Sequence, residues 1–286
     1  MILQETYTLA DGVEIPKIGL GTWFIDDGDA ARAVRDAVEA GYRHIDSAQA
    51  YGNERGVGEG VRSCGVSRDE VFVTTKLAAD IKSHDAAVTA IDGSLEALGL
   101  DRIDLVLIHS PQPWDSFGSE DRCFDGNREA WRALEEAVAA GKVRTIGVSS
   151  FQEPDLDNIL DACEVAPTVN QVLAHVTNVP TELIEGSRRR GMLVEAYSPM
   201  GHGELFKDKD VAAVAERYGV SIAQLAIRYT LQLGLLPLPK TADPDHMRSN
   251  AAVDFAISDE DMRALSGLDE IADYGEAGVF PVYARS

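Results

Sequence analysis

Apolar runs that end on a polar or small residue recur along the chain, and runs with helical spacing stand between them. Several apolar runs, such as residues 105–108, are uninterrupted, as in strands of a parallel sheet that is covered on both faces. The runs end near Gly21, Asp46, Lys76, His109, Ser149, Gln171, Tyr197 and Pro239. The segments between these ends are long enough for a helix to return the chain each time. The pattern predicts an α/β protein with a (β/α)8 TIM barrel.

Glycines mark the ends of three predicted helices. Apolar residues recur at helical spacing in residues 34–38, 88–98 and 130–138, and the runs stop at Gly41, Gly99 and Gly141. Asp125 is the expected N-terminal cap of the third helix. Two helices, 208–218 and 221–233, are predicted between the seventh and eighth strands, and a short one at 259–268.

Two segments lie outside the repeat. Residues 7–15 predict a β-hairpin around Asp11-Gly12 that closes the bottom of the barrel. The irregular tail after residue 268 carries Tyr274, Phe280, Pro281 and Tyr283, and we expect it to contact the substrate, because barrel active sites lie at the C-terminal ends of the strands. No strand is followed by Gly-x-Gly-x-x-Gly, which disfavours a doubly wound sheet. We therefore predict one barrel domain, 1–286.

Composition limits where in the cell the protein is expected to work. No apolar run approaches the roughly 20 residues of a membrane span, and the N-terminus does not resemble a secretory signal. The three cysteines have no metal-ligand spacing and are expected to be reduced, so we predict a cytoplasmic protein without a metal site.

The net charge of −22, from 48 acidic and 26 basic residues, is extreme. Such a chain repels nucleic acids and anionic membranes, which we exclude as partners. It also repels itself, and about 1 M salt removes most of this penalty by shortening the screening length to about 3 Å. A halophilic, salt-rich cytoplasm is one hypothesis, and an ordinary acidic cytosolic enzyme is the alternative.

Four residues at or just after strand ends have the chemistry to deliver a proton to a carbonyl: Asp46, Tyr51, Lys76 and His109. The free pKa of tyrosine, about 10, is high for donation near neutrality. A lysine about 4 Å away stabilises the phenolate by roughly 4 kcal/mol, enough to lower this pKa by about three units before burial opposes it. An aspartate keeps the lysine charged, and a histidine orients the oxygen or shares the proton. Singly, each residue has an ordinary structural explanation; their matched positions indicate a site.

At these residues the chain resembles the aldo-keto reductases. Residues 41–58, GYRHIDSAQAYGNERGVG, fit the first signature of that family at every defined position. Further motifs follow in the order of the family at residues 75–76, 107–111, 141–149, 169–171, 196–199 and 238–241. The likeness covers nearly the whole chain.

The resemblance implies NAD(P)H-dependent reduction of an aldehyde or ketone to an alcohol by hydride transfer. Tyr51 would be the general acid, Asp46 and Lys76 would tune it, and His109 would orient the carbonyl of a small-molecule substrate. We expect a monomer. The implied cofactor contacts are Gly21, Thr22, Trp23, Ser149, Ser150, Gln171, Tyr197, Ser198, Met200, Gly201, Lys240, Thr241, His246 and Asn250.

Departures from the family pattern concern the substrate pocket and the cofactor. Ser150 stands where the family usually has asparagine, and Ala78 where many members have an aromatic residue. Trp23, Trp114 or the tail would complete the wall that Ala78 leaves open, so Trp23, Ala78 and Trp114 are the predicted substrate contacts. The physiological substrate is not readable from these residues.

A second departure lies near Lys240 and Thr241, where relatives hold the 2′-phosphate of NADPH. His246 replaces an arginine that many relatives carry, and Asp243 would repel a phosphate but accept hydrogen bonds from a ribose diol. We therefore predict NADPH as cofactor, with NADH also used.

Three rival functions remain. A binding or scaffold protein would show apolar surface patches, against which the acidity argues. A non-catalytic, nucleotide-binding, redox-sensing barrel would be favoured by loss of one of the four residues, and none is lost. A metal-assisted barrel hydrolase needs clustered ligands at strand ends, where only Asp46 and His109 qualify.

Overall fold

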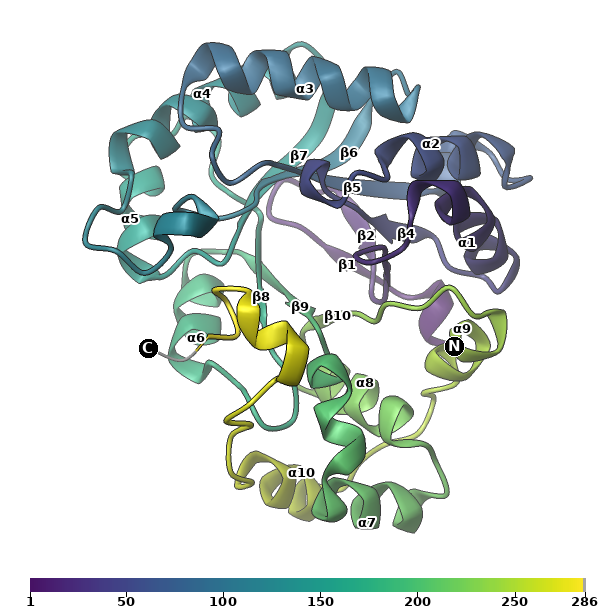
Figure 1. Cartoon of the computed structure of the whole chain (residues 1–286). Helices are drawn as coiled ribbons and strands as arrows, with labels where there is room; N and C mark the ends of the chain where they lie inside the picture. The colour runs from purple at the N-terminus through teal and green to yellow at the C-terminus, as the bar shows by residue number, and fades with distance from the viewer. Residues whose placement is uncertain (285–286) are drawn as a thin grey trace.

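The computed structural model describes residues 1–284, so the last two residues of the predicted domain lie outside the described residues. Eight parallel strands follow one another around a single sheet and form a nearly closed barrel with helices outside it, which confirms the predicted fold (Figure 1). The strands are β3 (Leu20–Gly21), β4 (His44–Asp46), β5 (Phe72–Leu77), β6 (Ile103–Ile108), β7 (Val143–Ser149), β8 (Val169–Leu173), β9 (Leu193–Tyr197) and β10 (Leu236–Leu238). A bridge between Gly21 and Lys240 joins the first strand to the segment after the last.

Each barrel strand is followed by one or two helices. They are α1 (Asp27–Glu39), α2 (Glu54–Ser63), α3 (His84–Leu98), α4 (Phe124–Ala139), α5 (Glu153–Leu160), α6 (Thr181–Arg189), α7 (Lys209–Tyr218), α8 (Ile222–Gln232), α9 (Pro244–Ala251) and α10 (Asp259–Ser266). Gly99 ends α3 in the left-handed conformation, as predicted. The predicted cap at Asp125 is wrong, because α4 begins at Phe124 and Asp125 lies in its first turn. None of the described helices is long and apolar enough to cross a membrane.

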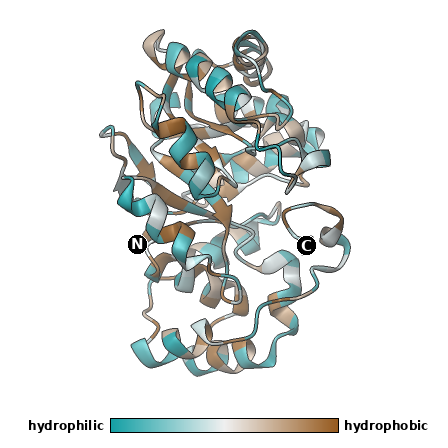
Figure 2. Cartoon of the chain, turned by 90° about the vertical axis from the view of Figure 1, so that its left-hand side faces the viewer, coloured by the Kyte–Doolittle hydropathy of each residue, from teal (hydrophilic) through white to brown (hydrophobic). Residues whose placement is uncertain are grey.

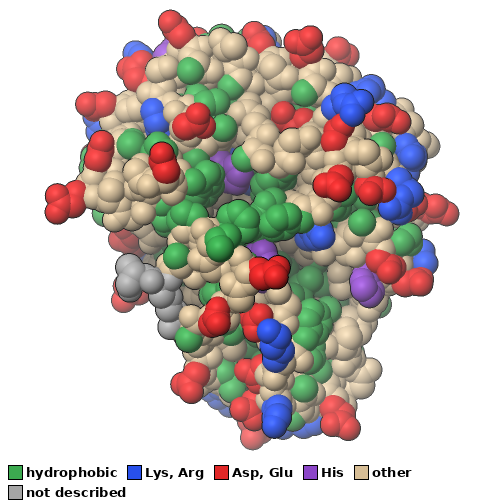
Figure 3. Space-filling view, viewed as in Figure 1, with side chains coloured by type: hydrophobic (Ala, Val, Ile, Leu, Met, Phe, Trp, Pro, Cys, Tyr) green, Lys and Arg blue, Asp and Glu red, His purple; other side chains and the backbone are tan. Residues whose placement is uncertain are grey.

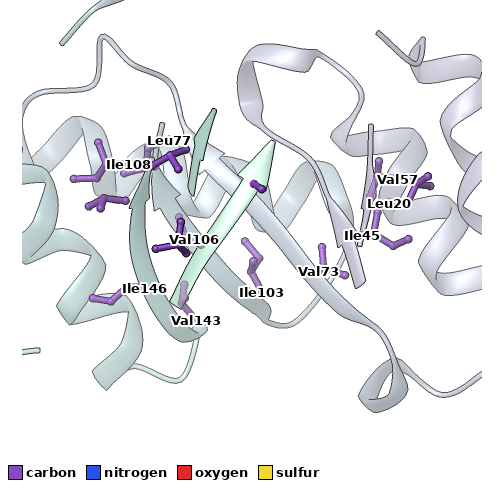
Figure 4. Packing of buried hydrophobic residues seen from close by; sticks show 14 of the residues in the cluster. Leu20, Ile45, Val57, Val73, Leu77, Ile103, Val106, Ile108, Val143 and Ile146 are labelled. Atoms are coloured by element: carbon purple, nitrogen blue, oxygen red, sulfur yellow. The ribbon is translucent and has the colours of Figure 1, made fainter. Parts of the chain in front are cut away.

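Alternation along the strands separates two cores. Val106 and Ile108 of β6 belong to the large cluster between the sheet and the helices (Figure 4), whereas Leu105 and Leu107 belong to a smaller cluster that fills the barrel. In Figure 2 the strands are mostly hydrophobic, while the helices carry both hydrophilic and hydrophobic residues. Because the side-chain period of a strand is two residues, this alternation fixes which polar side chains point into the barrel.

The hairpin β1 (Thr6–Thr8) and β2 (Glu14–Pro16) closes the barrel at its N-terminal end, as predicted. Leu9 and Ile15 are buried and join Phe72 and Leu105 in the inner cluster. The interior of the barrel is therefore filled with packed side chains at its bottom end, and the C-terminal ends of the strands remain open to a ligand.

Asp104, which is fully buried on β6, ties neighbouring elements together near this bottom end. Its Oδ2 accepts hydrogen bonds from Arg68 Nη2 at 2.6 Å and from Val73 N at 2.9 Å. Its Oδ1 accepts from Arg144 Nη1 at 2.8 Å. One carboxylate thus links β6 to the start of β5, to the start of β7 and to the segment before β5.

The tail after α10 returns to the C-terminal ends of the strands, where Figure 1 shows its yellow turn in front of β8 and β9. Tyr274 Oη lies 2.9 Å from His175 Nε2, and Tyr283 Oη lies 2.7 Å from Ser198 Oγ. Both tyrosines are buried, so aromatic side chains hold the irregular tail against the barrel.

Candidate active site

A cavity of about 640 Å³ opens at the C-terminal ends of the barrel strands. Figure 3 looks at this face and shows hydrophobic side chains gathered around its middle, with most acidic side chains toward its edge. Tail residues form part of the wall, and contact between the tail and a substrate stays a prediction. Aromatic and tail residues around the cavity are Trp23, Phe24, Tyr51, Trp114, Tyr197, Phe206, Phe280, Pro281, Val282 and Tyr283.

Lys76 lies at the centre of the predicted catalytic group and is fully buried. Its Nζ donates to Asp46 Oδ1 at 2.6 Å, to the Ser47 carbonyl at 2.8 Å and to Tyr51 Oη at 3.3 Å. All three N–H groups of the ammonium are therefore used, and they hold the carboxylate and the phenol on either side of it.

Local backbone structure explains this convergence. Asp46 and Lys76 point into the barrel because they sit in phase with the inward positions of β4 and β5. Tyr51 ends a short 3₁₀ turn, Gln49–Tyr51, which is terminated by Gly52 at φ +66°. Gln49 anchors the turn, since its Nε2 donates to the Ala90 carbonyl at 2.9 Å.

The expected direction of the Tyr51 pKa is wrong. Burial, followed by the negative charge of Asp46, raises the pKa of Tyr51 well above 10. Asp46 lies 2.6 Å from Lys76, so its negative charge acts on the phenol from the opposite side of the ammonium pair and opposes loss of the proton before substrate binds. Tyr51 is consequently a fully protonated phenol at neutral pH, ready to donate and stabilised by Lys76 only as negative charge develops.

His109 brings a neutral imidazole to the same cavity. Burial and the Lys76 charge lower the pKa of His109 well below 6.5. Its ring centroid lies 5.7 Å from that of Tyr51 and 5.3 Å from that of Trp114, edge-on in both cases. Nδ1 is buried and has no partner among residues 1–284, so Nε2 is the nitrogen that reaches the cavity. A neutral ring in this orientation can donate one hydrogen bond to a ligand oxygen.

Gln171 and Ser149 present free polar atoms on the opposite wall. Gln171 Nε2 donates to Asp46 Oδ2 at 2.9 Å and to Glu195 Oε2 at 2.7 Å. Two carboxyl acceptors require the nitrogen on that side, so the Gln171 carbonyl oxygen is left for a ligand. Ser149 ends β7 beside it and lines the same cavity. An acceptor next to a hydroxyl fits a planar carboxamide.

The other predicted cofactor residues fall into two groups. Those that line the cavity are Gly21, Thr22, Trp23, Ser150, Tyr197, Ser198, Met200 and Lys240. Gly201, Thr241 and Asn250 are buried nearby without lining it, and His246 is exposed on α9. A Cβ at Gly21 would lie 3.2 Å from the Leu238 carbonyl oxygen, a tight contact that favours glycine there.

Ser150 adopts the left-handed conformation, with φ +60°. Asparagine, which the resemblance implies at this position, is several-fold enriched in this region relative to other non-glycine residues. The serine keeps the backbone geometry, because its N–H donates to the Gln171 carbonyl at 2.9 Å, but it provides a shorter side chain.

Two expectations from the sequence, those for Ala78 and Asp243, differ from what the structure shows. Ala78 is not among the lining residues, and its N–H donates to Gln49 Oε1 at 2.9 Å, whereas Trp23 and Trp114 do line the cavity. Asp243 caps α9 instead of remaining free for a cofactor, since its Oδ1 accepts from Asp245 N at 2.8 Å. This capping lowers the pKa of Asp243.

Several residues in or behind the cavity gave little or no signal in the sequence. Phe24, His202 and Phe206 line the cavity without belonging to any predicted motif. Glu195 is fully buried behind Gln171, and its only signal was a single acidic residue within the apolar run of the seventh barrel strand.

Comparisons with known proteins agree on one family. The model of the Aldo/keto reductase family matches residues 17–270. A glyoxal reductase of Bacillus subtilis (strain 168) is 37% identical over 270 residues, covering 94% of this chain and 94% of that protein. The crystal structure of an aldo/keto reductase from Brucella melitensis gives a TM-score of 0.87 at 36% identity, covering 94% of this chain and 99% of that chain. An aldo-keto reductase of Bombyx mori in complex with NADP gives 0.85 at 32%, covering 98% and 99%.

Proposed function

The chain belongs to the aldo/keto reductase family and is an NAD(P)H-dependent oxidoreductase, and we propose that it reduces an aldehyde or ketone to the alcohol with Tyr51 as general acid. The observation that carries this proposal is the contact of Lys76 Nζ with both Asp46 and Tyr51, at the edge of an apolar cavity. We also propose that residues 1–286 belong to one barrel domain.

The nicotinamide cofactor supplies the hydride when it is bound. Ser149 and the carbonyl oxygen of Gln171 would hold its carboxamide, and the half-buried ring of Tyr197 would pack on the nicotinamide. His109 Nε2 and the Tyr51 hydroxyl bind the substrate oxygen and polarise it. Tyr51 then gives its proton to that oxygen, and the Lys76 ammonium stabilises the phenolate that forms. Asp46 keeps the ammonium charged in its buried position.

The direct test is the absorbance at 340 nm with a reactive aldehyde and either NADPH or NADH, with and without a chelator. We expect turnover that the chelator does not change. Cofactor binding without any turnover across aldehydes, ketoses and diketo acids would favour the redox-sensing alternative, and loss of turnover with the chelator would favour a metal-dependent reaction.

We propose that NADPH is used and that NADH supports a kcat/KM within about tenfold of it. Lys240, at the cavity edge, keeps one strong contact for the 2′-phosphate, while His246 lacks the charge of an arginine. His246→Arg should shift the kcat/KM ratio toward NADPH by about tenfold or more, because a hydrogen bond to a charged group contributes about 1.5–3 kcal/mol. His246→Gln is the matched control and should leave the ratio within threefold.

Asp243→Asn is a second test of the same loop, because asparagine also caps helices and the change removes only the charge. We expect a milder shift toward NADPH. A wild-type preference for NADPH beyond a thousandfold would contradict dual use and show that Lys240 alone decides the matter.

We also propose that the protein works in a halophilic, salt-rich cytoplasm. At a net charge of −22, screening by salt lowers the repulsion within the folded chain more than within the expanded unfolded chain. The melting temperature should therefore rise from dilute buffer to molar KCl. Thermal melts at both concentrations check this, and a melting temperature unmoved by salt would assign the acidity to solubility alone.

A further inference from the structure

Glu195 is a carboxyl group in the interior of the barrel that the proposed reaction does not use. It lies on β9, opposite Gln171 of β8 and Leu236 of β10, and its side chain is fully buried. Its Oε2 accepts the 2.7 Å hydrogen bond from Gln171 Nε2, and its Oε1 has no partner among residues 1–284. An apolar side chain would avoid the cost of burying this group, so packing alone does not account for it.

The surroundings of Glu195 keep it uncharged. Burial, followed by the charge of Asp46, raises the pKa of Glu195 to about 8. The charged groups that face it are Asp46 from β4 and Lys76 from β5, and all three N–H groups of Lys76 are bound elsewhere. A neutral carboxyl group at pH 7 carries its proton on one oxygen and leaves the other as an acceptor for Gln171.

The amide nitrogen of Gln171 therefore lies between two acceptors in the barrel interior, Asp46 and Glu195. This nitrogen donates one N–H to Asp46 and the other to Glu195, at 2.9 and 2.7 Å. A side-chain amide can otherwise offer either its nitrogen or its oxygen to a ligand, because the two ends have nearly the same shape. With both N–H groups committed to the interior, only the oxygen remains available to the cavity.

We propose that Glu195 is a positioning residue: with Asp46 it fixes the Gln171 amide so that its carbonyl oxygen accepts an N–H of the nicotinamide carboxamide. This inference rests on the proposed function, because it needs a bound nicotinamide dinucleotide. Without the Glu195 acceptor, one N–H of Gln171 has no partner in the interior. The amide then turns to offer that N–H to the cavity, where it no longer accepts from the carboxamide.

The test compares dissociation constants for NADP⁺ and for its 3-acetylpyridine analogue, measured by quenching of tryptophan fluorescence at pH 7. The analogue has a methyl group in place of the carboxamide NH₂, so it has no N–H to donate. Wild type should bind NADP⁺ about fivefold more tightly than the analogue, the effect of one neutral hydrogen bond. Glu195→Met should bring that ratio close to one. Glu195→Gln keeps an acceptor of the same shape and should retain the ratio.

A merely structural role would weaken binding of both dinucleotides in proportion and leave their ratio unchanged, so an unchanged ratio in Glu195→Met would overturn the proposal. An equal loss in Glu195→Gln and Glu195→Met would also overturn it. If Glu195→Met does not fold, Gln171→Met decides, because a ratio that survives loss of the amide excludes Gln171 as the acceptor. Wild-type protein that binds neither dinucleotide would refute the proposed function itself, which is a different result from an unchanged ratio.

Discussion

Tyr51→Phe is expected to lower kcat for carbonyl reduction by a factor of about 10² or more, because the substrate oxygen loses its general acid. The phenol is the group that lies between Lys76 and the cavity, at 3.3 Å from the ammonium. The ring remains, so the dissociation constant for NADPH should change less than threefold. Stopped-flow or steady-state absorbance at 340 nm measures the first quantity, and fluorescence quenching measures the second.

Tyr197→Phe is the matched control for Tyr51→Phe. It removes a hydroxyl from the same cavity, 3.5 Å from Ser150 Oγ, but keeps the ring that would pack on the nicotinamide. We expect kcat within a few-fold of wild type. Lys76→Met should be as damaging as Tyr51→Phe, because no charge would stabilise the phenolate. Turnover by Tyr51→Phe within threefold of wild type would refute the assignment of the general acid.

Asp104→Ala is expected to lower the free energy of unfolding by about 3 kcal/mol, which is the low end for breaking a buried ion pair. The substitution leaves the buried N–H of Val73 without an acceptor and removes two guanidinium contacts at once. The two arginines are partly exposed, so water takes over part of their solvation and moderates the cost. Urea unfolding of both proteins measures the difference.

Asp92→Ala removes a comparable ion pair from the surface, since Asp92 accepts from Lys142 with both side chains well exposed. It should cost less than about 1 kcal/mol. If Asp104→Ala costs no more than this control, then the three-way contact of Asp104 does not stabilise the barrel. Kinetic constants of the folded Asp104→Ala protein should stay near those of wild type, because the residue lies at the end opposite the cavity.

The sequence was sufficient to predict the barrel and the gathering of Asp46, Tyr51, Lys76 and His109 at one end of it. Both follow from one regularity: when parallel strands close into a barrel, residues at their C-terminal ends converge, so Asp46 and Lys76 had to meet if their strands were adjacent. The turn that carries Tyr51 follows β4 directly, which kept that residue close as well.

The errors came from quantities that depend on three-dimensional surroundings. The pKa of Tyr51 depends on burial and on the nearby charge of Asp46, and neither is visible in a residue pattern. The role of Asp243 changed once α9 was seen to start beside it, because a helix start needs an acceptor for its free N–H groups. A role for Glu195 could not be predicted, because its partner Gln171 is twenty-four positions away in the sequence.

The candidate site residues come from the ends of the strands, whereas part of the cavity wall comes from the tail, and this separation has an evolutionary consequence. Asp46 and Lys76 are held on the paired strands β4 and β5, His109 directly follows β6, and Tyr51 lies in the short turn after β4. The irregular tail supplies part of the cavity wall, including Phe280 and Tyr283, and it is held to the barrel through a few tyrosine contacts. Under the proposed function, mutations, insertions or exchange of that segment would change which carbonyl compound is accepted while Tyr51 stays in place. Substrate specificity can then diverge among descendant proteins while the reaction itself stays the same.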